Sequence, residues 1–143
     1  MQVENILQSK GTAVHTVRRS ARIAEAVALL NAHHIGAVVV VNAGGEVTGI
    51  LSERDIVRKM GDDPTAFLQT PVEQVMTAKV ITCARQDTIA TVMERMTQYR
   101  IRHMPILEAD GTLCGIVSIG DIVKRKIEET EQEANALREY IAS

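Results

Sequence analysis

The chain contains the same sequence unit twice, and this duplication limits its fold more than any other feature. Residues 49–57 read GILSERDIV, and residues 115–123, 66 positions later, read GIVSIGDIV. Farther upstream, VENIL at residues 3–7 resembles VEQVM at residues 72–76. Two copies without a third predict a pseudo-twofold pair whose halves enclose a cleft. We expect the functional site in that cleft.

Each copy is predicted to form a strand, a helix, a two-stranded hairpin and a second helix. Apolar residues recur on a helical period in the helices, and apolar runs beside Gly-containing turns mark the hairpins. In the first copy we expect strands at residues 14–17, 37–41 and 47–51, and helices at 23–30, with Ser20 as N-cap, and 52–60. In the second copy we expect strands at 80–83, 103–107 and 113–117, and helices at 88–98 and from 118 onward. The predicted class is α/β (α+β).

The repeat divides the chain into two units and two connecting or terminal segments. These are a first unit (residues 1–62), a linker (63–71), a second unit (72–127) and a C-terminal helical extension (128–143). A unit of about 65 residues is marginally stable alone. We therefore expect the two units to bury a common interface.

The last helix carries a heptad pattern through a highly charged sequence. Its apolar or small residues alternate in spacings of four and three, at Val123, Ile127, Thr130, Ala134, Leu137 and Ile141. Such a pattern is typical of a coiled-coil seam and favours self-association. The alternative is a solvated terminal helix that lies on its own domain.

Composition excludes several classes of protein. A net charge of −2 gives no support for broad nucleic-acid binding, and aromatic residues, at 2%, leave few rings for stacking bases. No segment approaches the roughly 20 apolar residues of a membrane span, and no signal sequence is evident, so we expect a cytoplasmic protein. Cys83 and Cys114 are too few for a disulfide framework and are expected to be buried apolar residues.

The repeated motif Gly-apolar-apolar-Ser-x-x-Asp has two interpretations. Ser52 with Asp55, and Ser118 with Asp121, match a helix capping box in which side chains satisfy free backbone N–H groups. The second interpretation is a ligand site, because a helix N-terminus binds phosphate and a carboxylate can accept both hydroxyls of a ribose. Two copies in register at a pseudo-symmetric junction favour the ligand site.

With this doubled motif, residues 1–127 resemble a tandem pair of CBS domains, a Bateman module, that stands alone. The segment from His103 to Ile106 also resembles the family's apolar-Pro-apolar strand, although Val39 replaces the proline in the first copy. The resemblance implies that each chain contains two β-α-β-β-α units packed through their sheets. It also implies that two chains associate as a homodimer. It also implies that adenosine-containing ligands (AMP, ADP, ATP, NAD or S-adenosylmethionine) bind between the units.

The resemblance implies two sites, each with an adenine pocket from one unit and a ribose-binding Asp from the other. One combines Ser52, Arg54 and Asp55 with Lys79, Ile81, Ile101, Arg102 and His103. The other combines Ser118, Gly120 and Asp121 with Lys10, His15, Ile35, Gly36 and Ala37. Arg102 and His103 are expected to favour a phosphate-rich ligand at the Asp55 site. Their counterparts Gly36 and Ala37 are uncharged, so the Asp121 site is expected to suit a smaller or less charged ligand, or the remote end of a dinucleotide.

We therefore expect a regulatory sensor of adenine nucleotides or dinucleotides that signals through a partner protein or its own oligomer. The alternative is a ligand-free interaction module that recruits a partner with its C-terminal helix, in which Asp55 and Asp121 serve only as caps. No P-loop, zinc motif or catalytic triad is evident, so we expect neither an enzyme nor a metal site. His33 and His34 are adjacent on a helix and therefore poorly placed to chelate one metal.

Overall fold

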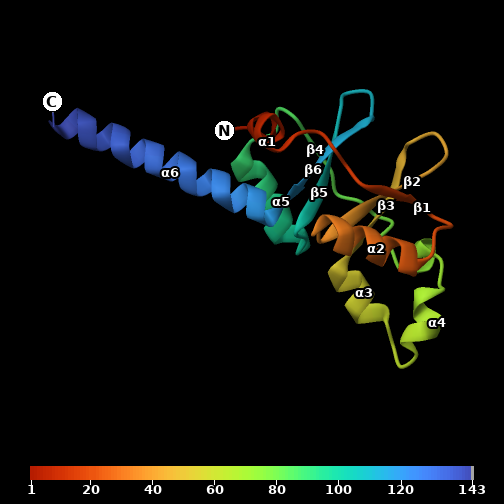
Figure 1. Cartoon of the computed structure of the whole chain (residues 1–143). Coiled ribbons are helices and arrows are strands. Elements are labelled where there is room, and N and C mark those ends of the chain that lie inside the picture. The colour runs from red at the N-terminus through yellow and green to blue at the C-terminus, as the bar shows by residue number, and fades with distance from the viewer. Residues whose placement is uncertain (143) are drawn as a thin grey trace.

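The structure is a computed structural model that describes residues 1–142; the last residue of the predicted extension, 143, lies outside the described part. Two sheets lie side by side with helices around them, and one long helix projects away (Figure 1). The first half contains α1 (Val3–Lys10), β1 (Thr16–Arg18), α2 (Ile23–His33), β2 (Ala37–Val41), β3 (Val47–Ser52) and α3 (Glu53–Lys59). After these follow α4 (Pro64–Leu68), a short 3-10 helix η1 (Val72–Gln74), β4 (Cys83–Ala84), α5 (Ile89–Tyr99), β5 (His103–Leu107), β6 (Leu113–Ser118) and α6 (Ile119–Ala142).

The two sheets repeat one topology. Their strand orders are β1-β2-β3 and β4-β5-β6, and in each the first pair is parallel and the second antiparallel. Ala37 pairs with Ser52 in the first hairpin, and His103 pairs with Ser118 in the second. The register also shifts at the equivalent place in both hairpins. The predicted α/β class and the duplicated unit are therefore confirmed.

The first strand of each unit is shorter than predicted, and the shortening is greater in the second unit. β1 pairs three residues with β2, whereas β4 pairs only Cys83 and Ala84 with β5. In the first unit the backbone N–H of Val39 donates to His15 O at 3.3 Å. The equivalent residue in β5 is Pro105, which has no N–H to donate. The missing donor explains why Thr82, the equivalent of Thr16 in β1, does not join the ladder.

The helices also differ from the prediction, most clearly at α4 and α2. The linker contains a helix, α4, because Asp63 accepts a hydrogen bond from Ala66 N and Pro64 occupies the first turn. At α2 the N-cap is Arg22 and not Ser20, and the helix continues to His33. Among residues 1–142, none of the helices combines the length and hydropathy that a membrane crossing requires.

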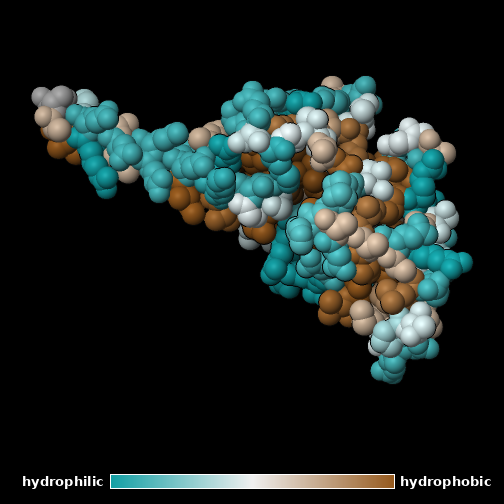
Figure 2. Space-filling model, viewed as in Figure 1, coloured by the Kyte–Doolittle hydropathy of each residue, from teal (hydrophilic) through white to brown (hydrophobic). Residues whose placement is uncertain are grey.

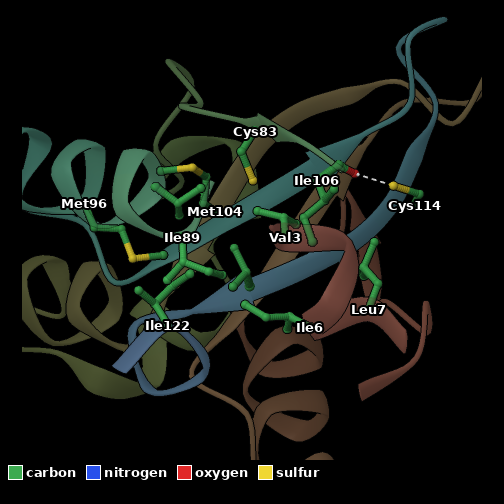
Figure 3. Close-up of a cluster of buried hydrophobic side chains, with 12 residues drawn as sticks. Val3, Ile6, Leu7, Cys83, Ile89, Met96, Met104, Ile106, Cys114 and Ile122 are labelled. Carbon is green, nitrogen blue, oxygen red and sulfur yellow. Dashed lines mark hydrogen bonds between the residues drawn. The ribbon is translucent and has the colours of Figure 1, made fainter. Parts of the chain in front are cut away.

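The hydrophobic cores do not follow the sequence repeat. Val3, Ile6 and Leu7 of α1 pack into the core of the second unit, as Figure 3 shows. Val72 and Val75, the equivalent residues of the second copy, pack into the core of the first unit. The two units thus exchange their leading segments, and each core contains residues from both copies.

Backbone hydrogen bonds fix the exchanged segments. Val3 N donates to Asp87 O at 2.9 Å, and Ile89 N donates to Met1 O at 3.0 Å. On the other side, Val72 N donates to Ala21 O at 2.7 Å. Each segment therefore satisfies its backbone groups on the opposite unit, so separating the units would expose both apolar surface and polar backbone.

The exchange explains the glycine that begins each repeated motif. A Cβ atom placed on Gly49 would lie less than 3.0 Å from Met76 Sδ, and one on Gly115 would lie less than 3.0 Å from Leu7 Cδ2. Met76 and Leu7 are equivalent residues of the two exchanged segments. Glycine is thus needed at both positions for close approach of an exchanged side chain.

We predict that Gly115→Ala lowers the free energy of unfolding by about 1–3 kcal/mol, because an extra methyl group overpacks the site of Leu7. Gly49→Ala should cost less, since methionine adapts its shape more readily than leucine. Gly120→Ala is the matched control, because its added Cβ would have no neighbour closer than 3.6 Å and alanine favours a helix. Urea unfolding of the three variants tests this order; equal losses at positions 115 and 120 would contradict it.

Candidate functional site

Both motif carboxylates form the predicted capping boxes. Asp55 Oδ2 accepts from the backbone N–H of Ser52 at 3.0 Å, and Ser52 Oγ accepts from Asp55 N at 3.2 Å. In the second copy, Asp121 Oδ2 accepts from Ser118 N at 2.9 Å, and Ser118 Oγ accepts from Asp121 N at 3.2 Å. The caps hold each carboxylate where a strand ends and a helix begins. They engage Oδ2 of each aspartate, and Oδ1 takes no part in the cap.

The Asp55 junction meets residues of the second copy. Thr77 Oγ1 donates to Asp55 Oδ1 at a long 3.4 Å, and the backbone of Thr77 pairs with Ile50. Arg54, the residue before Asp55 in α3, places its Nη1 3.5 Å from Arg100 O at the end of α5. Asp55 therefore contacts the exchanged segment of the second copy, and its neighbour Arg54 reaches the end of α5 in the second unit.

Asp121 is already paired with a cation. Lys10 Nζ lies 2.7 Å from Asp121 Oδ2 and donates to Ile116 O at 3.0 Å. Partial burial acts to raise the pKa of Asp121, but the hydrogen bonds from Lys10 and Ser118 outweigh it and hold the pKa below the ordinary value of 3.8. At neutral pH this carboxylate is ionised and neutralised by Lys10.

The surroundings of Asp121 are more cationic than the sequence indicated. One recess beside α1 and the start of α6 is lined by Lys10, Lys124 and Arg125 as well as Asp121. The expectation that this junction suits a less charged ligand rested on Gly36 and Ala37 alone. The recess weakens that contrast between the two sites, because α1 and α6 supply Lys10 and Lys124 where Gly36 and Ala37 supply no charge.

His103 lies where the two predicted residue sets meet. A Cβ atom on Gly36 would lie 3.0 Å from both Cε1 and Nε2 of His103, and 3.7 Å from Glu53 Oε1. Burial, followed by the charge of Lys10, lowers the pKa of His103 from its ordinary 6.5, and Glu53 and Asp121 only partly oppose this. His103 is therefore a neutral imidazole at pH 7 that can donate or accept a hydrogen bond between the units.

The remaining predicted residues differ in exposure. Lys79, Arg102 and Gly120 are exposed, whereas Ile35, Ile81 and Ile101 are half-buried at the edges of the two cores and Ala37 is buried. His15 stacks on His33 with ring centroids 3.6 Å apart. His15 thus contacts α2, a contact that the sequence did not predict.

The structure also identifies residues that sequence reasoning missed. Thr77 and Glu53 adjoin the Asp55 junction, and Lys124 and Arg125 adjoin Asp121. Glu53, Lys124 and Arg125 belong to the helices that the motif begins, so their spacing from Asp55 and Asp121 was a usable signal. Thr77 had no such signal, because it reaches Asp55 only through the exchange of segments.

The two cysteines are buried, and the possible metal-ligating side chains do not cluster within the described part of the chain. Within residues 1–142, no group of three or more His, Cys, Asp or Glu side chains is arranged to hold a metal ion. Burial, followed by the charge of Asp87, raises the pKa of the Cys83 thiol to about 12, and burial also raises that of Cys114. Both cysteines are buried in the second core, as predicted, and are protonated at neutral pH.

The geometry agrees with a known family. The family model for the CBS domain matches residues 6–62 and again residues 72–128. The chain belongs to the CBS domain family. Its two CBS domains stand in tandem, so it contains a Bateman module.

Related proteins share the pair. The CBS-domain containing protein ATU1752 from Agrobacterium tumefaciens has 44% identity and a TM-score of 0.83, over 88% of this chain and 99% of that one. The mitochondrial CBS domain-containing protein CBSX3 of Arabidopsis thaliana is 36% identical over 121 residues; they cover 82% of this chain but only 58% of the plant protein. The CBS domain pair of protein MJ0100, solved with 5-methylthioadenosine and S-adenosyl-L-methionine, has 25% identity and a TM-score of 0.79, over 90% of this chain and 98% of that one.

We predict that His103 makes stability fall in mild acid. Its pKa is lower in the folded than in the unfolded protein, so unfolded chains bind more protons below about pH 6.5 and the free energy of unfolding drops as pH falls. His103→Gln should remove this part of the loss between pH 7.5 and 5.5, measured by urea unfolding. His34→Asn removes an imidazole from the surface and is the control; it should lose as much stability between pH 7.5 and 5.5 as the wild type does. An unchanged pH slope in His103→Gln would contradict the prediction.

Proposed function

We propose that this protein is a regulatory module that binds an adenosine-containing ligand between its CBS domains. The ligand class comprises AMP, ADP, ATP, NAD and S-adenosylmethionine. The related MJ0100 pair, solved with two such adenosine compounds, supports the class but not the individual ligand. Binding would change the relation of the two units, and hence the surface that they present, to the extent that the ligand prefers one arrangement.

The position of Asp55 carries this proposal. Its carboxylate is held by the α3 cap, next to Arg54, which reaches α5 of the second unit; within residues 1–142 its Oδ1 accepts only a long 3.4 Å hydrogen bond from Thr77. A ribose hydroxyl can displace so weak a bond at little cost. In this proposal Asp55 binds ribose, Ile81 and Ile101 contact adenine, and Arg102 and His103 face the phosphates.

Asp121 is proposed as the second and weaker site. A ribose must compete there with Lys10, whose Nζ lies 2.7 Å from Asp121 Oδ2. A ligand that carries phosphate offers Lys10 and Lys124 a new anion and so offsets the loss of the ion pair. We therefore propose that ligand fills the Asp55 site first.

A second candidate is a ligand-free interaction module. The observation that favours it is the projecting end of α6, where Leu137 is 59% exposed and Ile141 is 74% exposed. In that case both motif aspartates act only as caps. The two functions are compatible, because a sensor needs a surface that changes when the ligand binds. We also propose that the protein is a cytoplasmic homodimer and that this CBS pair has no enzymatic activity.

Calorimetric titration of the Asp55 site tests the proposal. Asp55→Asn keeps a capping acceptor but removes the charge, and should lose a charged hydrogen bond worth about 1.5–3 kcal/mol, or roughly 10- to 150-fold in AMP affinity. Arg102→Ala should weaken ATP more than adenosine, because its proposed partner is phosphate. AMP should bind more tightly than GMP.

Asp63→Asn is the matched control, since Asp63 also caps a helix, α4, but lies away from the junction. It should leave AMP affinity unchanged. Equal affinity for AMP and GMP, or unchanged affinity in Asp55→Asn, would count against the proposed site. Absence of binding by any of the five ligands at millimolar concentration would favour the interaction module.

A further inference from the structure

The end of α6 presents an apolar surface that its own chain leaves exposed. This tail seam consists of Val123, Ile127, Thr130, Ala134, Leu137 and Ile141. Val123 is 44% exposed and Ile127 54%, and exposure rises to 74% at Ile141. Residues 130–142 are all exposed except the half-buried Ala134. Figure 2 shows hydrophobic residues on the projecting helix where it leaves the body and again at its tip, with mostly hydrophilic residues between them on this face.

The tail seam is distinct from the face of α6 that packs on the body. That inner face carries Ile122, which is fully buried, and Glu129, whose carboxylate lies 3.1 Å from the N-terminal amine of Met1. Adjacent residues on a helix point about 100° apart, so the seam that begins at Val123 lies beside the inner face and not on it. A second helix can therefore lie along the seam without displacing α1.

The charges beside the seam select a partner and an orientation. In heptad notation Ile127, Ala134 and Ile141 are a positions, which makes Lys126 and Glu133 g positions and Glu131 and Arg138 e positions. In a parallel pair each g residue faces the e residue five positions farther along the other helix. Lys126 would then meet Glu131, and Glu133 would meet Arg138. Both contacts are between opposite charges, and twofold symmetry makes each occur twice.

The antiparallel alternative brings like charges together. With the seams fully overlapped, Glu131 and Glu133 would each face their own copies on the partner helix. Lys124 would face Arg138 in the same arrangement. Like-charge contacts disfavour a pairing, so the flanking residues favour the parallel pair over the antiparallel one.

We propose that a second copy of this chain binds the tail seam to form a parallel, in-register two-stranded coiled coil. Ile at a positions with Leu137 at a d position suits two strands, whereas Thr130 and Ala134 bury little area. The dimer is therefore concentration-dependent, and it places both CBS pairs at the same end of the coiled coil. This proposal does not rest on ligand binding.

Cross-linking of the full chain tests the orientation. A parallel pair brings position 141 beside its own copy, whereas a fully overlapped antiparallel pair separates the two copies by about 27 Å, the rise of 18 helical residues. Ile141→Cys should therefore form a disulfide-linked dimer on mild oxidation. The wild type should not, because Cys83 and Cys114 are buried. Absence of a covalent dimer at 100 μM Ile141→Cys would overturn the parallel arrangement.

Sedimentation equilibrium of full-length variants tests the seam and the charges. Leu137→Asp should weaken self-association by more than about tenfold, because it places a charge in the seam, whereas Ala136→Asp, off the seam, should not. Glu133→Arg should also weaken the dimer, and adding Arg138→Glu to it should restore association. A monomeric wild type, a dimer that survives Leu137→Asp, or failure of the double swap to restore association would each overturn the proposal.

Discussion

The exchange of leading segments between the two units is the contact on which the rest of the structure depends. Leu7 packs on Gly115 in the second unit, and Met76 packs on Gly49 in the first. Each unit is too small to be stable on a modest core alone, and each completes its core with residues from the other copy. The two CBS domains are therefore expected to fold together, and the geometry of their junction follows from the packing of both cores.

The repeated motif serves this packing and the candidate site at the same time. Its glycine admits the exchanged side chain, and three residues later its serine ends the strand and caps the helix. The aspartate completes the cap and is thereby held at the junction. Because the exchanged segments differ, the two junctions differ as well: the first copy brings Lys10 to Asp121, whereas the second brings Thr77 to Asp55. Pseudo-symmetry in the fold thus yields two chemically unequal carboxylates.

Patterns within one element were predictable from the sequence, and contacts between distant elements were less so. Apolar runs and turn residues placed both hairpins within a residue of their observed bounds, and Ser-x-x-Asp predicted both caps. Periodicity carries no information on which unit a segment packs against, so the exchange was not foreseen, nor was Thr77 at the Asp55 junction. Two further features could have been predicted from the sequence but were not. Pro105 lacks the backbone N–H that would lengthen β4, and Asp63-Pro64 begins α4.

In the proposed function, the cap of α3 presents Asp55 to a ligand held between the units. A crystal structure of the full chain with AMP tests it most directly. We expect ribose hydroxyls within hydrogen-bond distance of the Asp55 carboxylate, adenine against Ile81 and Ile101, and the Ser52 cap intact. AMP bound elsewhere on the molecule, or bound at this junction with its ribose turned away from Asp55, would contradict it.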